Sequence, residues 1–324
     1  MTRRRAAGAV LLGTIVLLAA AAPVVTPHSP VQQFAGFENA PPMLPHLRGA
    51  GGLRAPFVRP LRLESRLERR FAETGSEKTI RWFAGGVLLS IDESEGPWLP
   101  LGSDPLGRDV FARLLYGARI SLAVAAVASV GALLLGILIG APAGFLGGRI
   151  EGLLMAFADF VLVLPAIYVA LALRSALPLV LSVGQVFWTL VLVFALLGWP
   201  IAARGVRGII AGERGKEYAE AAYAVGASPL RILLHHLLPS TRTFLIVSAT
   251  LMMPAFLLSE GTLTLVGLGF PVPTATWSAM LRDAWQGSAF TDAPWLLAPA
   301  AALILTMLSL HLLGSQDAGD STFS

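Results

Sequence analysis

Long apolar runs free of charge dominate this 324-residue chain and alternate with short segments that carry most of the Arg, Asp and Glu residues. A helix needs about 20 mainly apolar residues to cross the hydrocarbon core of a bilayer. The pattern therefore predicts an all-α integral membrane protein. Six segments meet or nearly meet the requirement for a transmembrane helix: Ala6–Val25, Ile120–Phe145, Gly152–Leu173, Val183–Ala203, Phe244–Ser259 with its apolar continuation, and Pro294–Leu313.

The first of these segments has two interpretations. Arg3–Arg5, an Ala/Leu run and then Ala20–Ala22 are typical of a secretory signal peptide as well as of a retained helix. We favour the retained helix because the rest of the chain is itself a membrane protein. Cleavage would leave five spans and an external amino terminus, and would not move the later loops.

Positive charge in the short loops predicts the orientation, because cytoplasmic loops carry an excess of Lys and Arg. If six helices alternate in direction, both termini are cytoplasmic. Residues 29–100 are then external despite their Arg content, since long loops translocate largely regardless of charge. The basic residues that fall together on the cytoplasmic side are Arg3–Arg5, Arg149, Arg204, Arg207, Arg214, Lys216, Arg231 and Arg242.

Composition and missing motifs narrow the functional classes. With 55% hydrophobic and 14% charged residues, the chain is unlike a soluble domain of this length. The net charge of +4 does not favour nucleic-acid binding, because most Arg residues lie beside apolar runs or in the external segment. The absence of cysteine excludes disulfides and thiolate chemistry. The sequence has no His-Glu-x-x-His or Gly-x-Ser-x-Gly motif, which argues against an intramembrane hydrolase.

The loop between the fourth and fifth predicted spans carries helix signals of its own. Glu217 and Glu220 put acidic side chains in the first turn of a short helix, where the helix dipole favours them. Gly226 ends that helix as a left-handed C-cap. Ser228 followed by Pro229 is a start signal for a second helix, which Pro239 closes.

These signals predict two short helices joined at a glycine. On the residues alone, an elbow that stands off the membrane and an amphipathic hairpin that lies on the lipid surface are equally favoured.

Three segments resemble a known family. Glu220-Ala221-Ala222, then Gly226, then Leu238-Pro239 resemble the EAA loop of permease subunits in binding-protein-dependent ABC importers. Leu101–Leu122 and Glu260–Leu281 resemble segments of the dipeptide/oligopeptide permease subfamily, specifically its C-type partner. The resemblance covers about two-thirds of the chain. Ser278 departs from the subfamily's usual Gly, and residues 29–100 are unmatched.

The resemblance implies a multi-pass permease in the bacterial plasma (inner) membrane. It implies four partners besides the lipid bilayer: a second homologous permease, two ATPase subunits and an external substrate-binding protein. The chain itself would be non-catalytic and bind no cofactor or metal, with ATP and magnesium on the ATPases. Gly215-Lys216 lacks the rest of a phosphate-binding loop, in agreement with this.

Di- or oligopeptides are the implied substrates. The alternatives are nickel or another small solute within the same family, or a secondary transporter, which would more often show an internal repeat and several ionisable residues within its spans.

The resemblance also implies the functional residues. Asp159 is a further candidate because it is an ionisable residue inside a predicted span. His235 and His236 are interpreted as interface or structural residues rather than metal ligands. The implied ATPase-coupling residues are Glu217, Glu220, Ala221, Ala222, Gly226, Arg231 and Pro239, and the outer-gate or interface candidates are Asp104, Arg108, Asp109, Glu260 and Trp277.

Two external helices complete the prediction. Leu63, Leu67 and Phe71 are spaced for a short amphipathic helix over Leu61–Phe71. Charged and apolar residues alternate over 101–119 as in an amphipathic helix at the outer interface. The predicted divisions are a transmembrane helix (1–28), an external insert (29–100), an external amphipathic segment (101–119), a five-helix permease core (120–316) with coupling loop 204–242, and a cytoplasmic tail (317–324).

Overall fold

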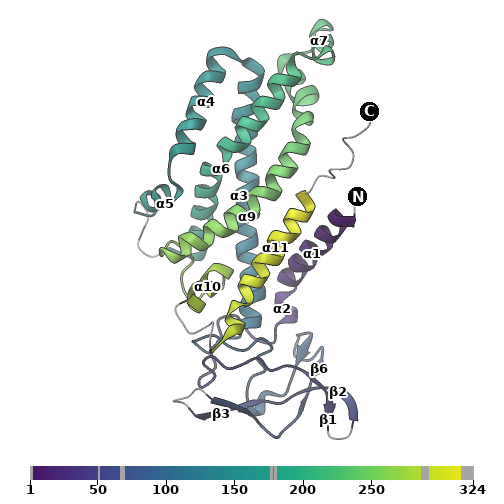
Figure 1. The fold of residues 1–324 in the computed structure, drawn as a ribbon, viewed down its shortest axis with the longest axis vertical. Coiled ribbons are helices and arrows are strands. Elements are labelled where there is room, and N and C mark those ends of the chain that lie inside the picture. Colours follow the sequence, from purple (N-terminus) through teal and green to yellow (C-terminus); the bar gives the residue numbers. More distant parts are fainter. Residues whose placement is uncertain are drawn as a thin grey trace. The chain divides into compact units, whose positions relative to one another are not determined.

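The protein is described by a computed structural model that covers residues 3–49, 52–65, 70–175, 178, 181–285 and 292–314. The described chain is mostly helical (Figure 1). It forms two compact units. The first unit comprises Met1–Ala9, Ala123–Leu263 and Leu308–Ser324, and the second comprises Val10–Leu122 and Thr264–Met307.

Among the described residues, four helical stretches are long and apolar enough to cross a membrane: α3, α6, the continuous stretch Pro229–Leu265, and Pro294–Gly314. The bent pair α4–α5 makes a fifth if it counts as one span. These helices confirm the prediction of a helical protein with several membrane spans. The prediction of six transmembrane helices stays a prediction. The helices are α1 Arg3–Ala20, α2 Ala22–Val25, α3 Val110–Leu146, α4 Gly148–Val163, α5 Ala166–Ser175, α6 Val183–Arg214, α7 Glu217–Ala224, α8 Pro229–Arg231, α9 Arg242–Leu265, α10 Trp277–Trp285 and α11 Ala298–Gly314.

Small residues let the helices of the first unit pack closely. A Cβ added to Gly136 of α3 would lie 2.5 Å from the Cβ of Ala202 on α6. The rings of Phe194 on α6 and Phe256 on α9 stack with their centroids 5.2 Å apart. Close backbone approach at small residues is how membrane helices gain van der Waals contact.

The third predicted span, Gly152–Leu173, is not one straight helix. Between α4 and α5 the axis bends by 86°. Leu164 is extended, with φ −70° and ψ 119°, and Pro165 follows it. Proline clashes with the helical conformation of the residue before it and removes a backbone donor, so the helix ends there.

Residues 29–100, predicted as an extended external segment, contain a small β structure, whereas the rest of the described chain is mostly helical. The strands are β1 His46–Gly49, β2 Gly52–Val58, β3 Leu61–Ser65, β4 Arg70–Glu73, β5 Lys78–Thr79, β6 Arg81–Trp82 and β7 Leu89–Ser90. Within the described residues they form three antiparallel sheets, in the orders β1-β2-β5, β3-β4 and β6-β7. Their core is apolar and buried, and it contains Ala40, Met43, Val58, Leu61, Ile80, Ile91, Trp98 and Leu99.

The predicted amphipathic helix Leu61–Phe71 is wrong. Its ends belong to β3 and β4, in which Leu63 pairs with Phe71. Leu61 and Leu63 are two residues apart, so one face of a strand can bury both. The apolar spacing fits a helical repeat as well as a strand repeat, and pairing between the strands selects the strand. Leu67 lies outside the described residues.

The predicted interfacial helix over 101–119 is also wrong. Residues before Val110 form turns, and α3 then continues to Leu146. Asp104, Arg108 and Arg113 are 4%, 2% and 1% exposed, respectively, so they face neither lipid nor water.

Pro239 does not close the second helix of the loop. The helical path runs on from Pro229 to Leu265 through a π-helical segment, Ile232–Leu237, and a 3-10 turn, Leu238–Thr241. Pro239 sits at the start of that turn, where a missing backbone donor is tolerated.

Candidate functional site

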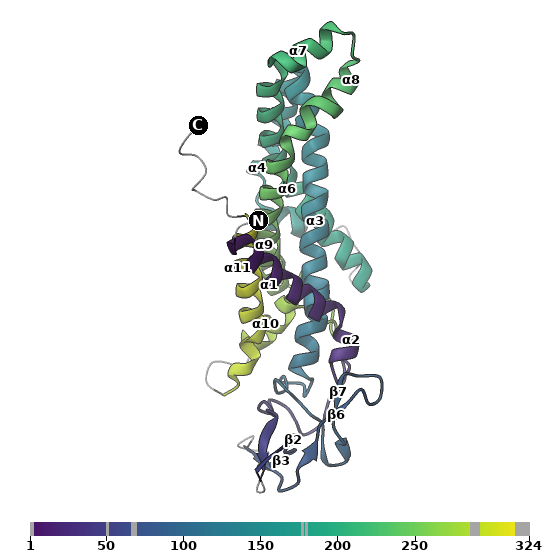
Figure 2. The same ribbon diagram turned by 90° about the vertical axis from the view of Figure 1, so that its right-hand side faces the viewer.

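The loop predicted to bind a partner forms an elbow of two short helices, α7 and α8, in the first unit (Figure 2). Gly226 has φ +82°, the left-handed region that the predicted C-cap requires. The nitrogen of Ala227 donates to Ala222 O at 3.0 Å, and that of Gly226 donates to Tyr223 O at 2.9 Å. Ser228 Oγ accepts from the nitrogen of Arg231 at 3.4 Å. Both predicted caps are confirmed.

Apolar packing fixes this elbow to its own unit. Ala219 and Ala222 of α7 are 0% and 8% exposed. They share one buried cluster with Ile210 of α6 and with Ile232 and Leu237, which follow α8. The inner face of α7 is therefore packed against α6 and against the helical segment that follows α8.

A pocket of about 460 Å³ opens on the elbow. Arg231 is its charged member, and Val225 is a rim residue that is 84% exposed. The pocket brings together four of the seven predicted coupling residues, Ala221, Ala222, Gly226 and Arg231, with Tyr218, Val225, Ala227 and His236. Glu217, Glu220 and Pro239 are exposed but do not line it. Its lining combines small apolar residues with the polar side chains of Tyr218, Arg231 and His236.

Polar contacts join α6 to α7. Glu213 accepts from Lys216 Nζ at 2.7 Å and from the hydroxyl of Tyr218 at 2.7 Å. Burial and the hydrogen bond to Glu213 raise the pKa of Tyr218 to about 12, so the phenol stays protonated and donates.

Two ion pairs link α4 to α6. Asp159, the ionisable residue predicted within a span, pairs with Arg204, and Glu151 pairs with Arg207. Pairing lowers the cost of carrying charge on a membrane helix, so Asp159 has a structural explanation.

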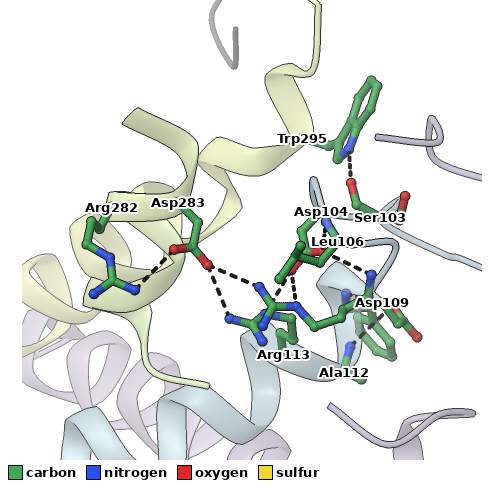
Figure 3. A network of polar contacts seen from close by, with 11 residues as sticks. Ser103, Asp104, Leu106, Asp109, Ala112, Arg113, Arg282, Asp283 and Trp295 are labelled. Carbon is green, nitrogen blue, oxygen red and sulfur yellow. Dashed lines mark hydrogen bonds and ion pairs between the residues drawn. The ribbon is translucent and has the colours of Figure 1, made fainter. Parts of the chain in front are cut away.

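The second candidate site is a buried network of two Arg and two Asp residues in the second unit. Arg108 Nε donates to Asp104 Oδ2 at 2.6 Å, and its Nη2 donates to Asp283 Oδ2 at 3.2 Å. Arg113 pairs with the same two oxygens at 3.3 and 3.6 Å (Figure 3). Arg282, which is partly exposed like Asp283, also donates to Asp283 Oδ1 at 3.3 Å, so with Arg282 the network comprises three cations and two anions. The ion pairs offset the cost of burying Asp104, Arg108 and Arg113.

Trp277 holds α10 in place so that Asp283 reaches this network. Its indole nitrogen donates to Leu114 O at 3.0 Å, and its backbone nitrogen donates to Ser121 Oγ at 3.2 Å. The structure thus connects three of the predicted candidates, Asp104, Arg108 and Trp277, through the start of α3 and through α10. Glu260 is buried on α9, in the other unit.

Arg113 and Asp283 were not among the predicted outer-gate or interface residues. Asp283 could have been found from the sequence because it follows the candidate Trp277 by six residues on the same short helix.

Asp109 belongs to a neighbouring cluster around His28. Asp109 Oδ1 caps α3 by accepting from the nitrogen of Phe111 at 2.8 Å. Its Oδ2 lies 2.9 Å from Nδ1 of His28, whose Nε2 lies 2.6 Å from Glu93. Burial lowers the pKa of His28, but the hydrogen bonds to Asp109 and Glu93 outweigh this effect and raise the pKa to about 9. His28 is therefore a cation at neutral pH.

Residues 132–316 match the family described as "Binding-protein-dependent transport system inner membrane component". The oligopeptide transport system permease protein OppC of Bacillus subtilis is 34% identical over 230 residues, 70% of this chain and 72% of the relative. The dipeptide transport system permease protein DppC of the same species is 36% identical over 223 residues, 68% and 67% of the two chains.

A third relative reaches further along the chain. The di/tripeptide transport system permease protein DppC of Pseudomonas aeruginosa is 29% identical over 309 residues, which is 95% of this chain and 84% of the relative. That coverage includes most of residues 29–100, so the expectation that this segment is unmatched is wrong.

Proposed function

This chain belongs to the inner-membrane components of binding-protein-dependent transport systems, and on that premise we propose that it is one of two permease subunits of an ATP-driven peptide importer. The two permeases form the translocation path, and an external binding protein delivers the substrate. The substrate class is supported by the names of the relatives, which are oligopeptide, dipeptide and di/tripeptide permeases.

The proposed topology has six spans with both termini in the cytoplasm of a bacterium. The broken pair α4–α5 is the third span and α1 is the first. The basic residues support this orientation because Arg3–Arg5, Arg149 and the loop over 204–242 fall on one side.

The elbow is proposed as the surface that receives the ATPase. The observation that carries this assignment is the pocket at Gly226, in which four of the residues implied by the family resemblance meet beside exposed apolar side chains. The buried faces of Ala219 and Ala222 transmit motion of α7 to α6. ATP and magnesium belong to the ATPases in this proposal, and this chain performs no chemistry.

The buried Arg/Asp network is proposed as a rigid outer anchor. It ties the start of α3 to α10 through Asp283 and Trp277, so the outer segments move as one body when a gate opens. Rigid-body motion of packed elements is a common form of gating.

ATP-dependent uptake of a labelled dipeptide tests the proposal. The chain is co-purified with its second permease and ATPases, reconstituted in vesicles and supplied with the binding protein. Val225→Asp places a charge on the exposed rim of the pocket and should abolish both ATPase co-purification and uptake. Val31→Asp, at an exposed position in the second unit, should leave both unchanged. Peptide uptake that persists in Val225→Asp would overturn the assignment of the elbow.

A further inference from the structure

The β6–β7 hairpin of the second unit displays two adjacent aromatic side chains. Trp82 is 59% exposed and Phe83 is 75% exposed. Arg81, the residue before them, is also exposed. Single exposed apolar residues are ordinary on protein surfaces, but two neighbouring aromatic rings beside a cation are a more specific combination.

The turn of this hairpin holds the pair in an unusual backbone conformation. Phe83 has φ +55°, a region that bulky residues seldom occupy. Its nitrogen donates to Leu88 O at 3.0 Å, which closes the turn. A strained conformation persists only where its surroundings fix it, and such positions are often functional.

A backbone hydrogen bond ties the hairpin to the end of the first apolar helix. The nitrogen of Leu88 donates to the carbonyl of Val24 at 2.6 Å, and α2 ends at Val25. Both views place β6 beside α2 (Figures 1 and 2). Along the preceding helix, Leu17 is 69% exposed and Val24 is 51% exposed, as expected of a surface covered by lipid.

Backbone hydrogen bonds keep the aromatic pair close to the end of the first apolar helix. Phe83 is two backbone hydrogen bonds from Val24, which at a strand spacing of about 4.8 Å is about 10 Å. A bilayer has a hydrocarbon core of about 30 Å within a total of about 40–45 Å, so each interfacial layer is roughly 5–8 Å thick. The backbone of Phe83 is therefore near the outer edge of the interfacial layer, and an aromatic ring directed from there toward the bilayer reaches the headgroups.

We propose that the β6–β7 hairpin is an interfacial anchor, with Trp82 and Phe83 in the headgroup layer of the bilayer and Arg81 at the lipid phosphates. The inference rests on the proposed role of α1 as the first span. Trp is enriched where membrane spans meet water, because its ring is amphipathic. Lipid is favoured over a protein partner as the occupant, because the hairpin continues the lipid-facing surface of α1.

Site-specific fluorescence quenching tests the anchor. The chain has no cysteine, so each single-cysteine variant can be labelled with one dye before it is assembled with its partner subunits. Leu17→Cys reports on α1, Phe83→Cys on the hairpin, and Leu53→Cys on an apolar control position of the insert that is 79% exposed. The vesicles contain phosphatidylcholine and phosphatidylglycerol, with a fraction of the lipids carrying a nitroxide near the headgroup or along the acyl chain.

The proposal expects loss of fluorescence at Phe83→Cys with the headgroup nitroxide, loss at Leu17→Cys with the acyl-chain nitroxide, and none at Leu53→Cys. Quenching at Leu17→Cys alone would overturn the anchor and leave the first span standing. Quenching at neither Leu17→Cys nor Phe83→Cys would overturn both. If the fluorescence of the dye at Phe83→Cys is insensitive to nitroxide lipids and changes only when the binding protein is added, the occupant is a protein and the lipid assignment is overturned.

Discussion

Replacing Gly226 should uncouple ATP hydrolysis from transport in proportion to the strain introduced. The residue has φ +82°, and no atom lies within 4 Å of an added Cβ, so space does not limit substitution. The cost of a side chain is therefore conformational, about 1–2 kcal/mol for an ordinary L-residue in the left-handed region. That cost corresponds to roughly a 5–30-fold loss in the population of the native elbow.

The series Gly226→Asn, Gly226→Ala and Gly226→Val separates this effect from steric effects. Asn tolerates the left-handed region, Ala bears the ordinary cost, and the β-branched Val bears more. The assay is the ratio of peptide imported to ATP hydrolysed in vesicles, which we expect to fall in that order. Gly215→Ala is the matched control, since Gly215 ends α6 at φ −89° and also has free space at its Cβ. Equal coupling in Gly226→Val and Gly215→Ala would refute the reasoning.

Three further predictions concern stability. Asp283→Asn leaves two buried Arg side chains opposite Asp104 alone and should cost about 3–5 kcal/mol, seen as a lower thermal midpoint in detergent; an unchanged midpoint would contradict the buried network. His28, with its pKa raised from 6.5 to about 9, contributes about 3 kcal/mol that is fully present below pH 6.5 and lost as the pH rises through 9, so stability between pH 7 and 10 should fall in the wild type and stay flatter in His28→Gln. Gly136→Ala pushes a Cβ against Ala202 and should cost about 1–3 kcal/mol, whereas Gly152→Ala, with open space, should be tolerated in the same unfolding assay.

Features set by neighbouring residues could be predicted from the sequence. The caps at Gly226 and Ser228 follow from local backbone chemistry, and the structure has both. Long apolar runs gave the spanning helices because hydropathy is summed over one continuous segment. The sequence shows the proline that breaks the helix at Pro165, but it does not give the bend of 86°. That angle depends on how the two halves of the broken helix pack against residues distant in the sequence.

Features set by distant residues could not be predicted. Leu61, Leu63 and Phe71 fit both a helical and a strand period, and only pairing between β3 and β4 selects the strand. Asp104 and Arg108 look like the polar face of an amphipathic helix. Their burial depends on Asp283, which lies 175 positions after Arg108. The pattern of polar and apolar residues along a segment indicates which charged side chains are exposed only where no distant residue of opposite charge pairs with them.

Protection of one cysteine tests the central claim most directly, namely that an ATPase binds the elbow. Ala221→Cys is exposed on α7 and lines the pocket, and the chain carries no other cysteine. We predict that adding the ATPase subunits slows its reaction with a water-soluble maleimide, while Val31→Cys in the second unit reacts at an unchanged rate. Equal labelling of Ala221→Cys with and without bound ATPase would contradict the account.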